Sequence, residues 1–174
     1  MSTPGNTPQY ATPFRPENHR YGETRWFEDF ALGEKFYINS RTQTDGLFAM
    51  FQAASGDNHP IHYDVEFCKA RGHKGLLAHG LQVLIQTVAG GGIFPHLCND
   101  SLLGFLDVSA KFLKPVYAGD TLYPELETVE LTPGRSTGVI GLRATVHNQA
   151  GELVLEGMHR YLLKKRPAPQ TLKA

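Results

Sequence analysis

Two hydrophobic patterns divide the chain, with helical spacing in its first half and strand-like stretches in its second half. A helix-start signal at Thr44 precedes apolar residues at helical spacing, which predict a helix over residues 45–55 that ends at Gly56. The same reasoning predicts two shorter elements, a strand over residues 36–44 and a helix over residues 65–71.

The second half of the chain predicts a sheet. From His79 to Gly90, apolar residues cover most sides of a helix, and such a helix is expected to be buried. Four strands follow, separated by short turns, which favours an antiparallel sheet. These strands are predicted over residues 102–116, 121–131, 137–147 and 152–164. The expected fold is α+β, with helices packed on one face of about five strands.

The ends of the chain differ from its middle. Prolines, glycines and small polar residues dominate residues 1–24, which are predicted to form a disordered or draped tail. One folded domain is expected over residues 25–165, because 174 residues allow one sizeable core. Residues 166–174 are basic and contain proline, so we expect a frayed tail.

The charge balance and the cysteine residues indicate which classes of partner and which cellular compartment to expect. Lys+Arg and Asp+Glu number 17 each, so the chain has no global attraction for nucleic acid or anionic membranes. Cys68 and Cys98 lie in apolar patterns without Cys-x-x-Cys spacing, which indicates buried, reduced thiols. No apolar run approaches the ~20 residues of a membrane span, and the N-terminus lacks a secretory pattern, so we expect a cytoplasmic protein.

Residues 55–64 concentrate ionisable side chains directly after the first predicted helix. Asp57 and His62 lie five positions apart across a turn restricted by Pro60, which can fold their side chains toward one point. A carboxylate and an imidazole that share one water can take a proton from it and deliver another to a substrate. Taken alone, the pair also fits a capping aspartate and a hydrogen-bonded loop histidine, while Asp64 fits a helix N-cap.

The His79-Gly80 step opens the long apolar helix. Glycine lets the backbone approach a ligand closely, and a helix N-terminus presents unpaired N–H groups. Together they can hold an oxyanion such as a thioester enolate, although a simple helix start is the alternative.

The remaining polar residues of this region have less specific interpretations. The histidines between residues 59 and 79 match no metal-binding spacing, so no metal is predicted. His59 is interpreted as a positioning or structural residue. Arg71 and Lys74 belong to a basic loop that is either solvated or in contact with the phosphates of a nucleotide-like ligand.

Two runs of sequence carry a family resemblance. They are ASGDNHPIHYD at residues 54–64 and GLLAHGL at residues 75–81, with weaker matches at residues 26–33 and 111–122. Together they cover about residues 25–165 and resemble the MaoC-like dehydratases, also called (R)-specific or type 2 enoyl-CoA hydratases. The resemblance implies the hot-dog fold, a curved antiparallel sheet wrapped around a buried central helix, with an overhanging active-site segment.

By position, the resemblance makes Asp57 and His62 the catalytic pair and the Gly80 backbone N–H the oxyanion donor. The reaction it implies is reversible syn hydration of a trans-2-enoyl-CoA to a (3R)-3-hydroxyacyl-CoA, in either direction. An acyl-CoA is then the substrate, no further cofactor is needed, and a homodimer or higher homo-oligomer is the expected assembly. The residues expected to position substrate are Asn58, His59, Tyr63 and His79.

The chain departs from the family pattern at two positions. His59 stands where many relatives carry Asn, and Tyr63 is bulkier than the small aliphatic residue common at that place. Both changes favour a short, branched or polar acyl group over a long chain.

Two other functions compete with a hydratase. A hot-dog acyl-CoA thioesterase usually carries its carboxylate on the central helix, but residues 80–92 contain no Asp or Glu. A non-catalytic acyl-CoA-binding subunit needs neither Asp57 nor His62, so the presence of both argues against it.

Overall fold

A six-stranded sheet forms the frame of the structure, a computed structural model that describes residues 14–168. Its strands are β1 (Lys35–Tyr37), β2 (Arg41–Thr42), β3 (Leu102–Phe112), β4 (Thr121–Pro133), β5 (Thr137–His147) and β6 (Leu153–Lys164). They follow the order β1-β4-β5-β6-β3, with β2 also on β4, and every pairing is antiparallel. The predicted antiparallel sheet of the α+β class is confirmed.

The single strand predicted over residues 36–44 is wrong, because the structure has two short strands there. The paired residues of β1 and β2 enclose three residues, 38–40, opposite only Tyr123 and Pro124 of β4. The extra residue interrupts the ladder, as a β-bulge does, and Pro124 has no N–H to donate at this point.

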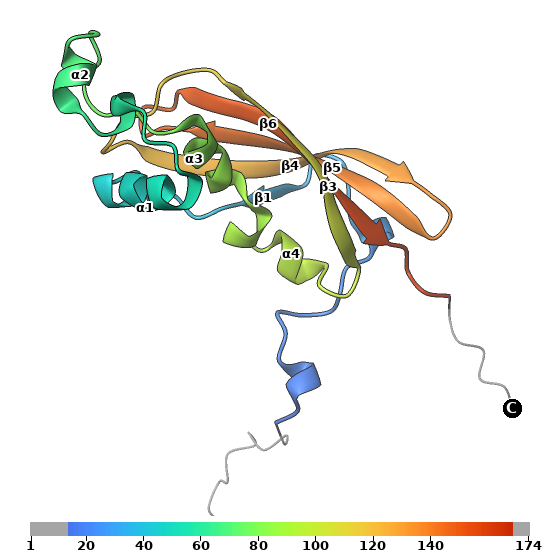
Figure 1. Cartoon of the computed structure of the whole chain (residues 1–174). Coiled ribbons are helices and arrows are strands. Elements are labelled where there is room, and N and C mark those ends of the chain that lie inside the picture. Colours follow the sequence, from blue (N-terminus) through green and yellow to red (C-terminus); the bar gives the residue numbers. More distant parts are fainter. Residues whose placement is uncertain (1–13, 169–174) are drawn as a thin grey trace, which may run out of the picture.

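In the described part of the chain, four α-helices accompany the sheet: α1 (Asp45–Ser55), α2 (Val65–Lys69), α3 (Gly80–Leu84) and α4 (Phe94–Leu97). In Figure 1, α1, α3 and α4 lie along one face of the sheet, and α2 projects beyond its end. The predicted caps are present in α1, where Thr44 Oγ1 accepts from the Leu47 N–H and Gly56 adopts φ 74°. The Asp64 carboxylate caps α2 by accepting from the Phe67 N–H.

The long buried helix predicted from His79 to Gly90 is shorter and less buried than expected. The α-helix stops at Leu84, and two 3-10 turns, Ile85–Thr87 and Ala89–Gly91, carry the chain onward. One side packs inward through Val83 and Thr87, but Leu81, Ile85 and Val88 are exposed. The break brings Gly92 against Ile38, where a side chain at Gly92 would meet the Tyr37 carbonyl at 2.6 Å.

The main core lies between these helices and the sheet. Phe30, Phe36 and Phe94 pack there with ring centroids 5.2–6.2 Å apart. Cys68 and Cys98 are buried and free, as their apolar surroundings predicted.

The two predicted tails fall partly outside the described residues, which leave out 1–13 and 169–174. Within the described part, the Tyr21 ring lies 4.6 Å from that of His96. The Arg166 guanidinium donates two hydrogen bonds of 2.6 Å to the Asp29 carboxylate. No helix between residues 14 and 168 combines the length and apolar character needed to cross a membrane.

Candidate active site

The candidate site forms where the loop after α1 meets the strand-like segment that leads into α3. Asp57 directly follows the left-handed Gly56, and His62 ends the 3-10 turn Pro60–His62. The His59 Nδ1 caps this turn by accepting from the Ile61 N–H at 3.3 Å. Pro60 therefore starts a compact turn that brings His62 back toward Asp57.

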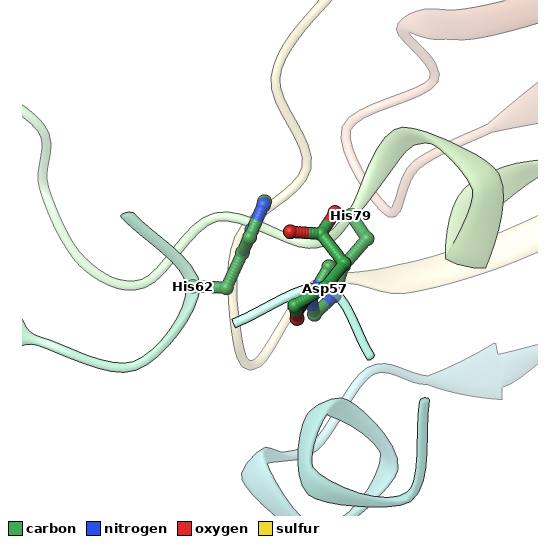
Figure 2. Close-up of side chains that lie close together, drawn as sticks. All are labelled: Asp57, His62 and His79. Atoms are coloured by element: carbon green, nitrogen blue, oxygen red, sulfur yellow. Dashed lines mark hydrogen bonds between the residues drawn. The ribbon is translucent and has the colours of Figure 1, made fainter. Parts of the chain in front are cut away.

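Asp57, His62 and His79 converge (Figure 2), and one nitrogen or oxygen of each lies within 4.8 Å of the other two. Asp57 is exposed, His62 is half-buried, and His79 is buried. A separation of this size between the Asp57 carboxylate and the His62 ring leaves room for one bridging water. The convergence expected from the five-residue spacing is thus present.

The His62 ring is held in one orientation. Its Nδ1 lies 2.7 Å from the Leu77 carbonyl oxygen. A carbonyl only accepts, so Nδ1 carries the hydrogen in the neutral ring and Nε2 keeps a free lone pair. Burial lowers the pKa of His62, the Leu77 bond opposes this, and the neighbouring His79 lowers it further. His62 therefore offers a neutral imidazole that can accept a proton at Nε2.

His79 stacks on His62, with ring centroids 3.7 Å apart and planes 22° from parallel. Imidazole lone pairs lie in the ring plane, so two nearly parallel rings cannot both point at one ion. Both nitrogens of His79 also have partners, Gln82 at Nδ1 and Asp57 and Tyr63 at Nε2. In this arrangement the three converging side chains do not form a metal site.

A cleft of about 280 Å³ opens beside Gly80. Gly80 is the first residue of α3, so its N–H has no acceptor within the helix. The Phe112 ring stands 3.3 Å from where a side chain at Gly80 would begin, so glycine leaves the most room beside this amide. The α-helix has only five residues, so the fixed N–H donor matters more here than the helix dipole. The cleft is lined by Leu77, Ala78, Gly80, Val83, Phe112, Leu113, Lys114, Pro115, Val116 and Val154.

The other predicted residues surround this centre. Asn58 and His59 are exposed, and the His59 ring faces the edge of Phe67. The Arg71 guanidinium stacks over the same Phe67 ring, 3.4 Å from its centroid, and the Lys74 ammonium lies 4.5 Å from the centroid of the Tyr117 ring. Both cations border the loop without belonging to the Asp57–His62 cluster.

Sequence reasoning missed two residues of this region, Gln43 and Gln82. Both are buried, and the Gln82 amide donates to Gln43 Oε1 at 3.1 Å. Gln82 could have been identified in the sequence as the polar residue among the apolar residues that follow His79-Gly80. Only the fold places Gln43 beside it, 39 residues away.

Comparison with known proteins identifies the family of this chain. The family model described as MaoC like domain matches residues 29–149. The chain is 30% identical over 153 residues to the mesaconyl-CoA hydratase of Cereibacter sphaeroides, covering 83% of this chain and 44% of that protein. It therefore spans about half the length of that relative.

Two solved structures share the fold. One is described as the monoamine oxidase regulatory protein from Archaeoglobus fulgius, with TM-score 0.76 and 32% identity over 83% of this chain and 97% of that chain. The other, a Mycobacterium tuberculosis protein described as a double hotdog fold, gives TM-score 0.68 and 29% identity over 83% of this chain and 45% of that chain. Because the family model covers more than half of the 174 residues, this chain belongs to the family of MaoC-like dehydratase domains.

Proposed function

We propose that this domain catalyses the reversible hydration of a trans-2-enoyl-CoA to a (3R)-3-hydroxyacyl-CoA, with Asp57 and His62 as the acid–base pair. The observation that carries this proposal is the distance between the two groups, which suits one shared water. Gly80, which directly follows His79 of the same cluster, lines the cleft and has no acceptor for its N–H within α3. The relative named mesaconyl-CoA hydratase supports hydration of a CoA thioester in general.

In the hydration direction, Asp57 and His62 hold the water and remove one of its protons as its oxygen bonds to C3 of the substrate. The electrons move toward the thioester oxygen, and the Gly80 N–H stabilises the enolate charge that develops there. The pair then delivers a proton to C2, so one water is added across the double bond. Dehydration runs through the same steps in reverse and requires no further cofactor.

The substrate we propose has a short, branched or polar acyl group. This proposal follows from His59 and Tyr63, the two positions of the loop that depart from the family pattern. Lys74 and Arg71 are the residues we propose for the CoA phosphates, because both border the loop of the site with exposed side chains.

The assembly we propose is a homodimer formed through β3. This strand ends the sheet order, and Phe105, Leu106 and Val108 on it are exposed. An apolar edge strand of this length is a surface that folded proteins normally cover.

The test of the function is incubation with crotonyl-CoA while the enoyl absorbance and free thiol are followed together. Loss of the enoyl band without thiol release is the expected result. Thiol release would instead identify a thioesterase, and a signal in neither channel across short enoyl-CoA esters would contradict an enzymatic role. Turnover that rises steadily from C4 to C12 substrates would refute the short-chain assignment.

A further inference from the structure

A chain of buried polar side chains runs from the sheet side of the molecule to the candidate active site. Gln43, Gln82 and His79 are 0%, 2% and 1% exposed. Gln43 Nε2 lies 3.4 Å from the Arg41 carbonyl, Gln82 Nε2 donates to Gln43 Oε1 at 3.1 Å, and Gln82 Oε1 lies 3.1 Å from His79 Nδ1. Buried polar groups are costly unless they are bonded, so each of these bonds restricts the next side chain.

This series of buried polar side chains ends at the backbone carbonyl of Asp57. The His79 Nε2 lies 3.0 Å from the Asp57 carbonyl oxygen and 2.6 Å from the Tyr63 hydroxyl. The same hydroxyl lies 3.2 Å from the Asp57 carbonyl, so two side chains hold one backbone oxygen.

The Asp57 carboxylate itself is held weakly. It is exposed, and it accepts from the His59 N–H at 3.4 Å. Its place is therefore set mainly through the backbone, by Tyr63 and His79.

The same imidazole also contacts the second member of the pair. The His79 ring stacks on His62 at 3.7 Å, while Leu77 fixes the other side of the His62 ring through Nδ1. One buried side chain thus touches both Asp57 and His62, and Gln82 contacts its Nδ1 at 3.1 Å.

We propose that His79, oriented by Gln82 and assisted by Tyr63, is a positioning residue that sets the separation of the Asp57 carboxylate and the His62 ring. This role rests on the proposed function, in which Asp57 and His62 are the acid–base pair. Tyr63, which was also expected to shape the acyl pocket, contributes its hydroxyl to this support.

Two substitutions of His79 separate positioning from simple packing. In His79→Gln the amide nitrogen takes about the place of Nε2 and can still donate to the Asp57 carbonyl. In His79→Asn it takes about the place of Nδ1, so the bond to Gln82 is kept and the bond to Asp57 is lost. Tyr63→Phe removes only the hydroxyl and keeps the ring packed, which guards against a variant that does not fold.

The expected result with crotonyl-CoA is a kcat for His79→Asn that falls on the order of 10²-fold, the cost of misplacing a reacting group by about 1 Å. His79→Gln should recover a large part of that loss, and Tyr63→Phe should lower kcat with KM little changed. Equal kcat in the wild type and His79→Asn, measured per folded molecule, would overturn the proposal.

A second readout does not depend on activity. The ¹⁵N shift of the Asn58 amide reports hydrogen bonding at the Asp57 carbonyl, because the two atoms share a peptide bond. It should move in His79→Asn and return toward the wild-type value in His79→Gln. If the wild type hydrates no enoyl-CoA but this pattern holds, the proposed function fails and the positioning role stands. If the shift is the same in all three proteins, the positioning role is refuted.

Discussion

Replacing Asp57 by Asn tests the proposed chemistry with little disturbance of the fold. The change removes the carboxylate charge and keeps the size of the side chain. The carboxylate is exposed, its bond to the His59 N–H is long at 3.4 Å, and no salt bridge in the described part of the chain includes it. The free energy of unfolding should therefore change by no more than about 0.5 kcal/mol.

The effect on rate should be far larger. A general acid–base group contributes about 10²–10⁴ in rate, which corresponds to about 3–5 kcal/mol of activation free energy. The Asn amide cannot exchange a proton with the shared water, so the loss should fall on kcat more than on KM.

The assay is crotonyl-CoA hydration with purified wild type, Asp57→Asn and Asp64→Asn, together with thermal unfolding of each. Asp64→Asn is a matched control, because Asp64 caps α2 and Asn is an equally good N-cap. The control should keep the wild-type rate. A wild-type rate in Asp57→Asn would remove this carboxylate from the mechanism, and an equal loss in both variants would point to the loop fold instead.

Two further predictions concern stability and assembly. Burial lowers the pKa of both His62 and His159 below the usual ~6.5, so the unfolded chain binds protons that the folded chain does not. The free energy of unfolding, measured by urea titration, should therefore be greatest above about pH 6.5, fall as the pH drops from there toward the lower folded-state pKa values, and level off below them. A flat profile between pH 7.5 and 5 would contradict this. If the proposed dimer forms through β3, Val108→Lys, which places a charge on this edge strand, should give a monomer in light scattering, whereas Val129→Lys on the inner strand β4 should leave the dimer intact. A Val108→Lys dimer as tight as the wild type would exclude β3 as the interface.

Local signals made part of the fold predictable. The helix over residues 45–55 was correct because Thr44 and Gly56 act on the backbone beside them. The strand over residues 137–147 was also correct, because apolar residues and turn residues bound it on the chain itself.

The errors arise where distant segments decide the structure. The strand over residues 36–44 was broken by its partner β4, which carries Pro124. The helix from His79 ends at Leu84, and the 3-10 turns after it lead to the contact of Gly92 with Ile38, which are 54 positions apart. Hydrophobic periodicity describes a single segment, so it cannot predict the contacts that this segment makes with distant parts of the chain.

The same limit applies to the candidate site. The approach of Asp57 and His62 was foreseeable because Pro60 acts locally between them. The role of the buried His79 side chain was not, because it depends on Gln43, Gln82 and Tyr63 meeting it in the fold.

The fixed backbone around the site has a consequence for how binding energy is used. The Asp57 carbonyl and the His62 ring are both held by bonds within the chain, to His79 and Leu77, before any ligand arrives. A ligand that enters the cleft then meets groups that are already arranged, so it loses little affinity to ordering the loop. In the proposed reaction, the binding energy of the distant CoA portion is then available to stabilise the transition state at the reacting end of the substrate.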